Sequence, residues 1–383
     1  MRVLIVEPAV KSIAPNIALM KWCTWCENEG HEYQYVVGIQ DIGFTPDRIL
    51  MSCIFSFYSE VYKKTINYYR RLFPDADIIV GGSFPTMCPE WFDITFASNP
   101  FFATKGVTVH SGLCDDIEDL PPKYSVAPES KKIVMYASRG CKYKCGYCAV
   151  PKLEGKLRSF KSILPILEHG HKEIPDATGV VLYDNNFTAH TYFDNIVDEL
   201  RDFGLPVDIH GLHVSDFTDH QAKRFAELRW GAQSETGTAY LRFSFDWMQY
   251  EKHIRRALTW VKQYDVRAAF FCYMLFNWKD SPSDFWQRII KAQEITDDVG
   301  KTIFLFPQRY EPLTALKRNQ YIGSKWTPEL VTGITRMYTF MHGFIPTTKT
   351  HNIFRWIGSN EEEFMQRAMD FATIPHYRLI KSN

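Results

Sequence analysis

The chain has 383 residues, of which 45% are apolar and 15% aromatic, so it can bury a sizeable core and is long enough for about two globular domains. Its 44 basic and 44 acidic side chains cancel, which argues against a domain-wide electrostatic grip on nucleic acid or on an anionic membrane. The first residues lack the basic lead of a signal peptide, and no apolar run approaches the roughly 20 residues of a membrane span, so we expect a cytoplasmic protein.

Residues 1–115 alternate between strand-like and helix-like patterns. The strand-like segments are short apolar runs at 2–8, 32–38, 47–57 and 75–82. The helix-like segments are amphipathic and span 16–29 and 60–73. This order predicts an α/β, Rossmann-like domain whose parallel sheet is covered by helices on both faces. The polar, turn-rich residues 116–131 are expected to link this domain to the next.

The same alternation resumes over residues 132–310. The strand-like segments lie at 132–138, 179–184, 207–214, 241–246, 266–275 and 301–307. Helical patterns separate them, which gives six strand–helix units and predicts a partial (β/α)6 TIM-like barrel, two units short of a full one. Residues 311–383 are expected to form a helical carboxyl-terminal extension, with Ser359-Asn360 as a helix cap and its methionines as core filler.

Three of the nine cysteines lie close together in the stretch SRGCKYKCGYCAV, directly after the strand predicted at 132–138. Cys141, Cys145 and Cys148 therefore sit at the carboxyl end of a parallel strand, where α/β folds place their active sites. Three thiolates suit an iron–sulfur cluster or zinc, and an odd, clustered set fits a metal site in a reducing compartment better than disulfides. Structural zinc needs a fourth ligand, and no Cys or His follows Cys148 within twenty residues.

The C-x3-C-x2-C loop after the first strand of a partial barrel resembles the radical SAM superfamily. The resemblance implies that the three cysteines hold a [4Fe-4S] cluster whose fourth iron chelates S-adenosylmethionine. It also implies reductive cleavage of that cofactor to a 5′-deoxyadenosyl radical, with a reductant such as flavodoxin or ferredoxin. The alternatives are a structural zinc loop or three cysteines buried as small hydrophobes.

The resemblance also assigns cofactor contacts near the ends of the next strands. Tyr147 occupies the position beside the adenine. Asp184, Asn185 and Asn186 form a polar turn that is expected to bind the methionyl amino group, although they depart from the common Gly-Gly-Glu form. Asn and Asp also favour helix N-caps, and Asn186 suits that second interpretation equally well.

A further polar set, Arg242, Ser244 and Asp246, falls on one side of a strand by the period of two. The resemblance suggests contacts with ribose hydroxyls or the cofactor carboxylate, whereas Arg242 by itself suits a structural ion pair equally well. The pair His210 and His213, with Asp216 nearby, is expected to line the pocket or pack rather than bind a metal.

The remaining cysteines of note have apolar neighbours. Cys272 lies on a predicted core strand and is more often a packing residue than a radical donor. Cys23 and Cys26 form a C-x-x-C, but Trp22 and Trp25 are interleaved with them on an apolar helix, which favours core packing over a redox pair.

The amino-terminal domain resembles the cobalamin-binding domain that precedes the barrel in many radical SAM enzymes. The stretches RVLIVEP and IIVGGSFPTMCPE carry the resemblance, with Gly81 and Gly82 where a flat cofactor would dock. The Asp-x-His-x-x-Gly pattern that supplies a cobalt ligand is absent, because the corresponding place reads EPAVKSIAPN. Either cobalamin binds without a protein ligand, or the domain now shapes the substrate pocket.

Two outcomes of radical formation stay open, cobalamin-dependent methylation of an unactivated carbon and a rearrangement without cobalamin. The substrate is a small molecule, a nucleotide or a peptide; neither a membrane nor nucleic acid is indicated. The alternative from another class is a zinc-stabilised nucleic-acid-binding protein without radical chemistry, which the neutral net charge disfavours.

Overall fold

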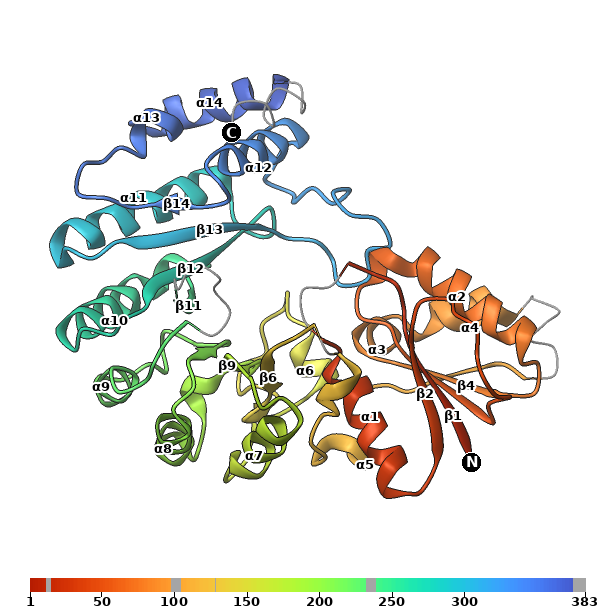
Figure 1. The fold of residues 1–383 in the computed structure, drawn as a ribbon. Helices are drawn as coiled ribbons and strands as arrows, with labels where there is room; N and C mark the ends of the chain where they lie inside the picture. The colour runs from red at the N-terminus through yellow and green to blue at the C-terminus, as the bar shows by residue number, and fades with distance from the viewer. Residues whose placement is uncertain (12–14, 98–104, 128, 232–238, 375–383) are drawn as a thin grey trace. The chain divides into compact units, whose positions relative to one another are not determined.

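The computed structural model describes residues 1–11, 15–97, 105–127, 129–231 and 239–374 (Figure 1). The chain divides into two compact units. The first comprises Met1–Asn185 and Pro312–Asn319, and the second comprises Asn186–Glu311 and Gln320–Asn383. None of the helices in the described ranges combines the length and the apolar character that a membrane crossing needs.

The first unit contains a five-stranded parallel sheet in the order β2-β1-β3-β4-β5. Its strands are β1 (Arg2–Glu7), β2 (Glu32–Val37), β3 (Arg48–Ser52), β4 (Asp77–Gly81) and β5 (Val107–Val109). Ile5 of β1 pairs with Tyr35 of β2 on one side and with Leu50 of β3 on the other. The strand order therefore reverses at β1, and this switch point is where open α/β sheets bind their ligands.

Alternate side chains of the strands enter separate cores on the two faces of this sheet. Val3 and Ile5 pack toward α1 (Ile17–Asn28). Leu4 and Val6 face the opposite core, to which three further helices contribute side chains. Those helices are α2 (Ser59–Leu72), α3 (Ser83–Met87) and α4 (Pro89–Ala97), with the 3-10 turn η1 (Ser56–Tyr58) before α2. The predicted sheet with both faces covered is confirmed.

Cys23 and Cys26 confirm the core-packing interpretation of their C-x-x-C. Both are fully buried in the core beneath α1. Burial raises the pKa of both thiols, that of Cys26 to about 12, because a thiolate loses its hydration there. Burial and a raised pKa both fit the role of packing residues.

The expected linker is anchored by specific contacts within the first unit. It contains α5 (Asp115–Glu118) and the 3-10 turn η3 (Tyr124–Val126). The Thr24 hydroxyl donates to the Pro121 carbonyl at 2.7 Å, and the Tyr124 hydroxyl donates to the Val134 carbonyl at 2.9 Å. This segment is thus fixed both to α1 and to the strand that follows it.

The remaining part of the first unit carries the cysteine loop. The strands β6 (Lys132–Met135) and β9 (Gly179–Leu182) pair in parallel. Between them lie β7 (Ser138–Arg139), α6 (Val150–Leu153), β8 (Arg158–Ser159) and α7 (Leu164–Glu173). The short antiparallel pair β7–β8, which the sequence pattern did not predict, brackets the three cysteines.

The second unit continues the strand–helix alternation. In chain order its elements are η4 (Phe187–Ala189), α8 (Phe193–Phe203), β10 (Val207–Ile209), α9 (Asp219–Phe225), β11 (Tyr240–Ser244), η5 (Met248–Tyr250), α10 (Glu251–Gln263), β12 (Ala269–Phe276), α11 (Pro282–Val299), β13 (Ile303–Arg309), α12 (Pro328–Phe340), β14 (Ile345–Pro346), α13 (Phe354–Ile357) and α14 (Glu361–Thr373). The strands β11, β12 and β13 are parallel, and β14 adds an antiparallel edge.

Each of the six strands expected over residues 132–310 has a counterpart, and the α/β fold class is confirmed. The strand expected at 207–214 is shorter, because β10 ends at Ile209. In the extension, Asn360 accepts a hydrogen bond from the Glu363 amide at 3.0 Å, so the expected cap of α14 is present. The rest of the predicted extension, 375–383, lies outside the described residues.

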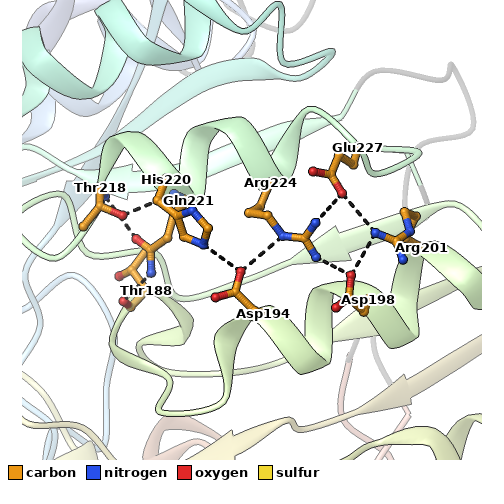
Figure 2. Close-up of polar contacts among 9 residues, drawn as sticks. All are labelled: Thr188, Asp194, Asp198, Arg201, Thr218, His220, Gln221, Arg224 and Glu227. Carbon is orange, nitrogen blue, oxygen red and sulfur yellow. Dashed lines mark hydrogen bonds and ion pairs between the residues drawn. The ribbon is translucent and has the colours of Figure 1, made fainter.

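An ion-pair network joins α8 to α9 on the surface of the second unit. Figure 2 shows Arg224 reaching Asp194, Asp198 and Glu227, with Asp194 at 3.2 Å and Glu227 at 2.5 Å. Arg201 adds contacts to Asp198 at 2.8 Å and to Glu227 at 3.2 Å. Several shared charges stabilise more than an isolated surface pair does, so this network helps to fix the two helices together.

Candidate functional site

The cysteine loop begins at a glycine that no other residue replaces easily. Gly140 has a φ of +76°, and a Cβ built there would lie 2.2 Å from the Lys156 carbonyl oxygen. The backbone after β7 therefore passes directly against the chain that enters β8. This close approach holds the start of the loop next to Cys141.

All three cysteines of the sequence motif belong to this loop. All three are partly buried, and the Cys148 amide donates to the Cys145 carbonyl at 3.0 Å. Desolvation by burial raises the pKa of the Cys148 thiol. No Cys, His, Asp or Glu trio of the described ranges is already arranged as a metal site. Three thiols on one partly open loop nevertheless have the chemistry that an iron–sulfur cluster requires.

Asp184 contacts the residues that directly precede the cysteine loop. Its carboxylate accepts hydrogen bonds from the Ala137 amide at 2.9 Å and from the Ser138 hydroxyl. The side chain is buried, and desolvation raises its pKa from the ordinary 3.8 to about 6. Both of its oxygens thus bind the chain just before the cysteine loop, so the structure gives Asp184 a supporting position. Contact with a cofactor amino group stays a prediction for this residue.

The two asparagines after Asp184 have different partners. The Asn185 side chain donates to Glu154 at 2.8 Å within the first unit. Asn186 belongs to the second unit, where it donates to Asp216 at 2.9 Å and accepts from Thr188 at 2.7 Å. Asn186 precedes η4, but its side chain makes no capping hydrogen bond. Asn186 therefore occupies the N-cap position of η4, as the second interpretation predicted, but its side chain makes hydrogen bonds elsewhere.

A buried arginine beside the cysteine loop escaped the sequence analysis. Arg139 is 8% exposed and lies 3.2 Å from Glu118 and 3.3 Å from Glu154 in ion pairs. Its guanidinium lies 3.8 Å from the centre of the Tyr136 ring. The dipeptide Arg139-Gly140 directly before Cys141 could have drawn attention to this arginine. Its ion-pair partners, Glu118 and Glu154, could not be identified because no local pattern links them to Arg139.

A cavity of about 570 Å³ lies within the first unit at the carboxyl ends of β3 and β4. Its wall includes the first turn of α1, Gly81 and Gly82, and the apolar side chains Trp22, Leu50 and Ile79. Its polar wall contains the buried Lys21 and Arg139 and the partly buried Glu118 and Glu154. The volume and the mixture of apolar surface with a few polar groups are typical of a ligand site.

The two predicted glycines form the turn after β4. Gly82 has a φ of +102°, and a Cβ there would lie 2.7 Å from the Cys53 carbonyl oxygen. The Cys53 amide in turn donates to the Gly81 carbonyl at 2.8 Å. The glycine pair thus lets the ends of β3 and β4 meet at the wall of the cavity, where side chains would fill the space.

Lys21 is a buried cation of the cavity wall. Its ammonium donates to the Glu118 backbone carbonyl, and burial lowers its pKa to about 8. His110, at the end of β5, also lines the cavity, with its Nε2 at 3.1 Å from the Leu113 carbonyl oxygen. Neither residue belongs to a local motif, and only the folded chain brings Lys21 and His110 to one cavity wall.

Tyr147 is partly buried within the cysteine loop, between Cys145 and Cys148. Its contact with an adenine stays a prediction. In the second unit, Arg242 and Ser244 share the less buried side of β11, as the period of two predicted. Arg242 lies 2.7 Å from Asp208, so the expected ion pair is present.

Asp246, the third member of the predicted polar set, follows β11 rather than belonging to it. It lies beyond the end of β11, is buried, and accepts a hydrogen bond from the Leu275 amide at 2.8 Å. Cys272 is fully buried on β12, and desolvation raises its pKa well above the ordinary value, which fits a core cysteine. His213 packs edge-on against Tyr250, with ring centres 5.5 Å apart.

Comparisons with known proteins give structural neighbours alone, since no family model and no curated protein matches the chain. The chain is similar to the apo structure of OxsB, a cobalamin-dependent S-adenosylmethionine radical enzyme, with 14% identity and a TM-score of 0.51. The match covers 76% of this chain and 51% of OxsB, so the chain spans about half the length of that enzyme. This likeness shows the fold, and the predicted structural resemblance to radical SAM enzymes is confirmed at that level.

A second neighbour is SuiB of Streptococcus suis. Its crystal structure matches with 13% identity and a TM-score of 0.38, covering 56% of this chain and 46% of SuiB. The structure of SuiB bound to the precursor peptide SuiA matches with 12% identity and a TM-score of 0.38, covering 71% and 62%. These values are too low for an argument about fold or site.

Proposed function

We propose that this chain is a radical SAM enzyme whose cluster ligands are Cys141, Cys145 and Cys148. The observation that carries the proposal is the loop itself, with three thiols following Gly140 at the end of the first barrel strand. When bound, a [4Fe-4S] cluster with one open iron supplies the electron that breaks the C5′–S bond of S-adenosylmethionine, giving methionine and a 5′-deoxyadenosyl radical. Cys141, Cys145 and Cys148 would hold that cluster, and the chemistry it would supply is hydrogen abstraction from an unactivated carbon of the substrate.

The surrounding residues hold the loop and the cofactor in the reacting geometry. Asp184 binds the backbone before the cysteines, which fixes the position of the donor set. We assign contacts with S-adenosylmethionine to Tyr147 and Asn185 in the first unit. Arg242 and Ser244 of the second unit are the proposed partners of its ribose or carboxylate, and the buried, bonded Asp246 has a supporting role.

The cavity supports cobalamin as a second cofactor. It lies over β3 and β4 of a Rossmann-like sheet, beside the first turn of α1, and Gly81 of the glycine turn leaves room for a flat ligand at its wall. Since EPAVKSIAPN contains no histidine, the first loop offers no cobalt ligand of the familiar kind. Binding without a protein ligand from that loop fits these residues, and cobalamin-dependent methylation is the reaction that we propose.

A rearrangement without cobalamin is the second candidate, and the missing histidine pattern favours it. In that case the cavity would form part of the substrate pocket. A small molecule, a nucleotide or a peptide is the substrate class that we propose, with flavodoxin or ferredoxin as reductant. The reducing, cytoplasmic setting fits nine cysteines that form no disulfide.

Metal analysis tests the proposal against a zinc-stabilised nucleic-acid-binding protein. The chain is purified anaerobically, reconstituted with iron and sulfide, and analysed for iron, sulfide and zinc. We expect about four iron and four sulfide per chain, as a cubane cluster requires. Stoichiometric zinc without sulfide would overturn the proposal. An absorption spectrum after hydroxocobalamin is added and the excess removed separates the two radical outcomes.

A further inference from the structure

The Glu154 carboxylate contacts both chain segments that border the proposed cofactor site. Its Oε2 accepts a hydrogen bond from the Gly140 amide at 2.7 Å and another from the Asn185 side chain at 2.8 Å. Gly140 directly precedes the ligand Cys141, and Asn185 follows the second barrel strand. One partly buried oxygen therefore fixes the start of the cysteine loop relative to Asn185, the proposed cofactor residue.

The other oxygen of Glu154 extends this contact to Arg139. Glu154 Oε1 lies 3.3 Å from Arg139 Nη2, and Arg139 Nε lies 3.2 Å from Glu118 on the far side. Glu118 belongs to α5, which Lys21 of α1 holds through its backbone carbonyl. These charges are largely removed from water, so each one is costly to leave without its partner. A displacement of Glu118, Arg139 or Glu154 would therefore shift the neighbouring charged side chain as well.

Glu118 and Glu154, the two carboxylates on either side of Arg139, both border the cavity. Its wall includes Glu118, Tyr136, Arg139 and Glu154. A ligand in the cavity would thus touch the same guanidinium and carboxylates that hold the cysteine loop. These side chains therefore connect the wall of the cavity to the start of the cysteine loop, although Glu118 and Gly140 lie in separate segments of the sequence.

We propose that Glu154 is a positioning residue that clamps the cysteine loop, and that Arg139 transmits occupancy of the cavity to this clamp. The inference rests on the proposed function for its cluster and its cobalamin. Neither residue need touch the reacting atoms. Both act through the backbone at Gly140 and through Asn185, which makes the geometry of the cluster loop depend on the contents of the cavity.

The variants separate the clamp from its link to the cavity. Glu154→Gln keeps an oxygen acceptor for Gly140 but loses the charge toward Arg139, whereas Glu154→Ala removes both. Arg139→Met keeps the length of the side chain and removes the guanidinium. Arg158→Met is the matched control, because Arg158 pairs with Arg139 across the β7–β8 hairpin and its side chain is 49% exposed.

Hydrogen–deuterium exchange on cluster-free protein tests the clamp without reference to activity. In Glu154→Ala we expect the amides after Arg139 to exchange about tenfold faster or more, because the buried acceptor of the Gly140 amide is lost. Glu154→Gln and Arg158→Met should exchange at the parent rate. Parent-like exchange in a folded Glu154→Ala variant would overturn the clamp. Should that variant fail to fold, Glu154→Asp takes its place, because its shorter side chain draws the carboxylate away from the Gly140 amide. Faster exchange after Arg139 in Glu154→Asp supports the clamp, and parent-like exchange overturns it.

Hydroxocobalamin then serves as the probe of the link. We expect its binding to slow exchange in the cysteine loop of the parent and of Arg158→Met, but not of Arg139→Met. Equal slowing in Arg139→Met would overturn the role of Arg139. Absence of hydroxocobalamin binding to the parent would overturn both the cobalamin assignment and the link. The exchange data on Glu154 would still decide the clamp, so the two failures are distinguishable.

Discussion

The carboxylate of Asp184 accepts a 2.9 Å hydrogen bond from the Ala137 amide, although 47 residues separate them. The contact joins the end of β9 to the chain that enters the cysteine loop. Parallel neighbours in a sheet bring their carboxyl ends together, so a polar residue after one strand can fix the loop after the other. The position of the three thiols thus depends on a residue that is itself not a metal ligand.

Asp184 is expected to make stability depend on pH. Its folded pKa of about 6 exceeds the ordinary 3.8, so the folded chain binds the proton more tightly than the unfolded chain. This contribution to stability is fully present below pH 3.8 and is lost as the pH rises through about 6. Denaturation of Asp184→Asn should lack this component, with an overall loss of about 1–3 kcal/mol for the unsatisfied partners. An unchanged pH profile would contradict the assignment.

The contribution of the α8–α9 network to stability should fall at low pH, opposite to that of Asp184, and it should also fall at high salt. The Arg224 side chain lowers the pKa of Asp198, so its contribution is present above the ordinary carboxyl pKa and is lost as the pH falls through the lowered value. Arg224→Met should lower the free energy of unfolding by about 1 kcal/mol or less. High salt should remove most of the difference between variant and parent. A loss that is independent of salt would point to packing instead.

Arg288 should be a major stabilising residue of the second unit. It is 1% exposed, pairs with Asp280 at 2.7 Å, and donates to backbone carbonyls after β11, including that of Asp246 at 2.9 Å. Arg288→Met should cost about 3–5 kcal/mol, because it leaves a buried carboxylate without its partner. Chemical denaturation measures the loss. The double variant with Asp280→Leu should recover part of it, and no recovery would refute the buried-charge explanation.

Gly81→Leu should fill the cavity. The glycine has room for a Cβ, since the nearest atoms, both of His110, would lie at 4.0 Å. The larger side chain should reduce hydroxocobalamin affinity more than about tenfold by steric exclusion, while the thermal midpoint changes little. Gly43→Ala is the matched control, because nothing lies within 4 Å of its Cβ. Unchanged affinity in Gly81→Leu would place the cobalamin elsewhere or exclude it.

Secondary-structure elements that have a local sequence pattern could be predicted from the sequence. Residues 2–7 and 77–81 are apolar runs between turn formers, and both form the expected strands. The cysteine loop was recognisable because its three residues lie together. The Arg139–Glu154 pair was not, since it depends on a hairpin of two-residue strands that no periodicity marks. The predicted strand at 241–246 extends past the observed end of β11 at Ser244, because a strand boundary is poorly marked by composition.

Cleavage of S-adenosylmethionine tests the central claim most directly. Anaerobically reconstituted protein is incubated with S-adenosylmethionine and a strong reductant, and methionine and 5′-deoxyadenosine are quantified by mass spectrometry. We expect both products in equal amounts from the parent and from Cys114→Ala, and neither from variants in which Cys141, Cys145 or Cys148 is replaced by alanine. Intact S-adenosylmethionine with the iron-loaded parent, or equal cleavage by the cysteine variants, would contradict the account.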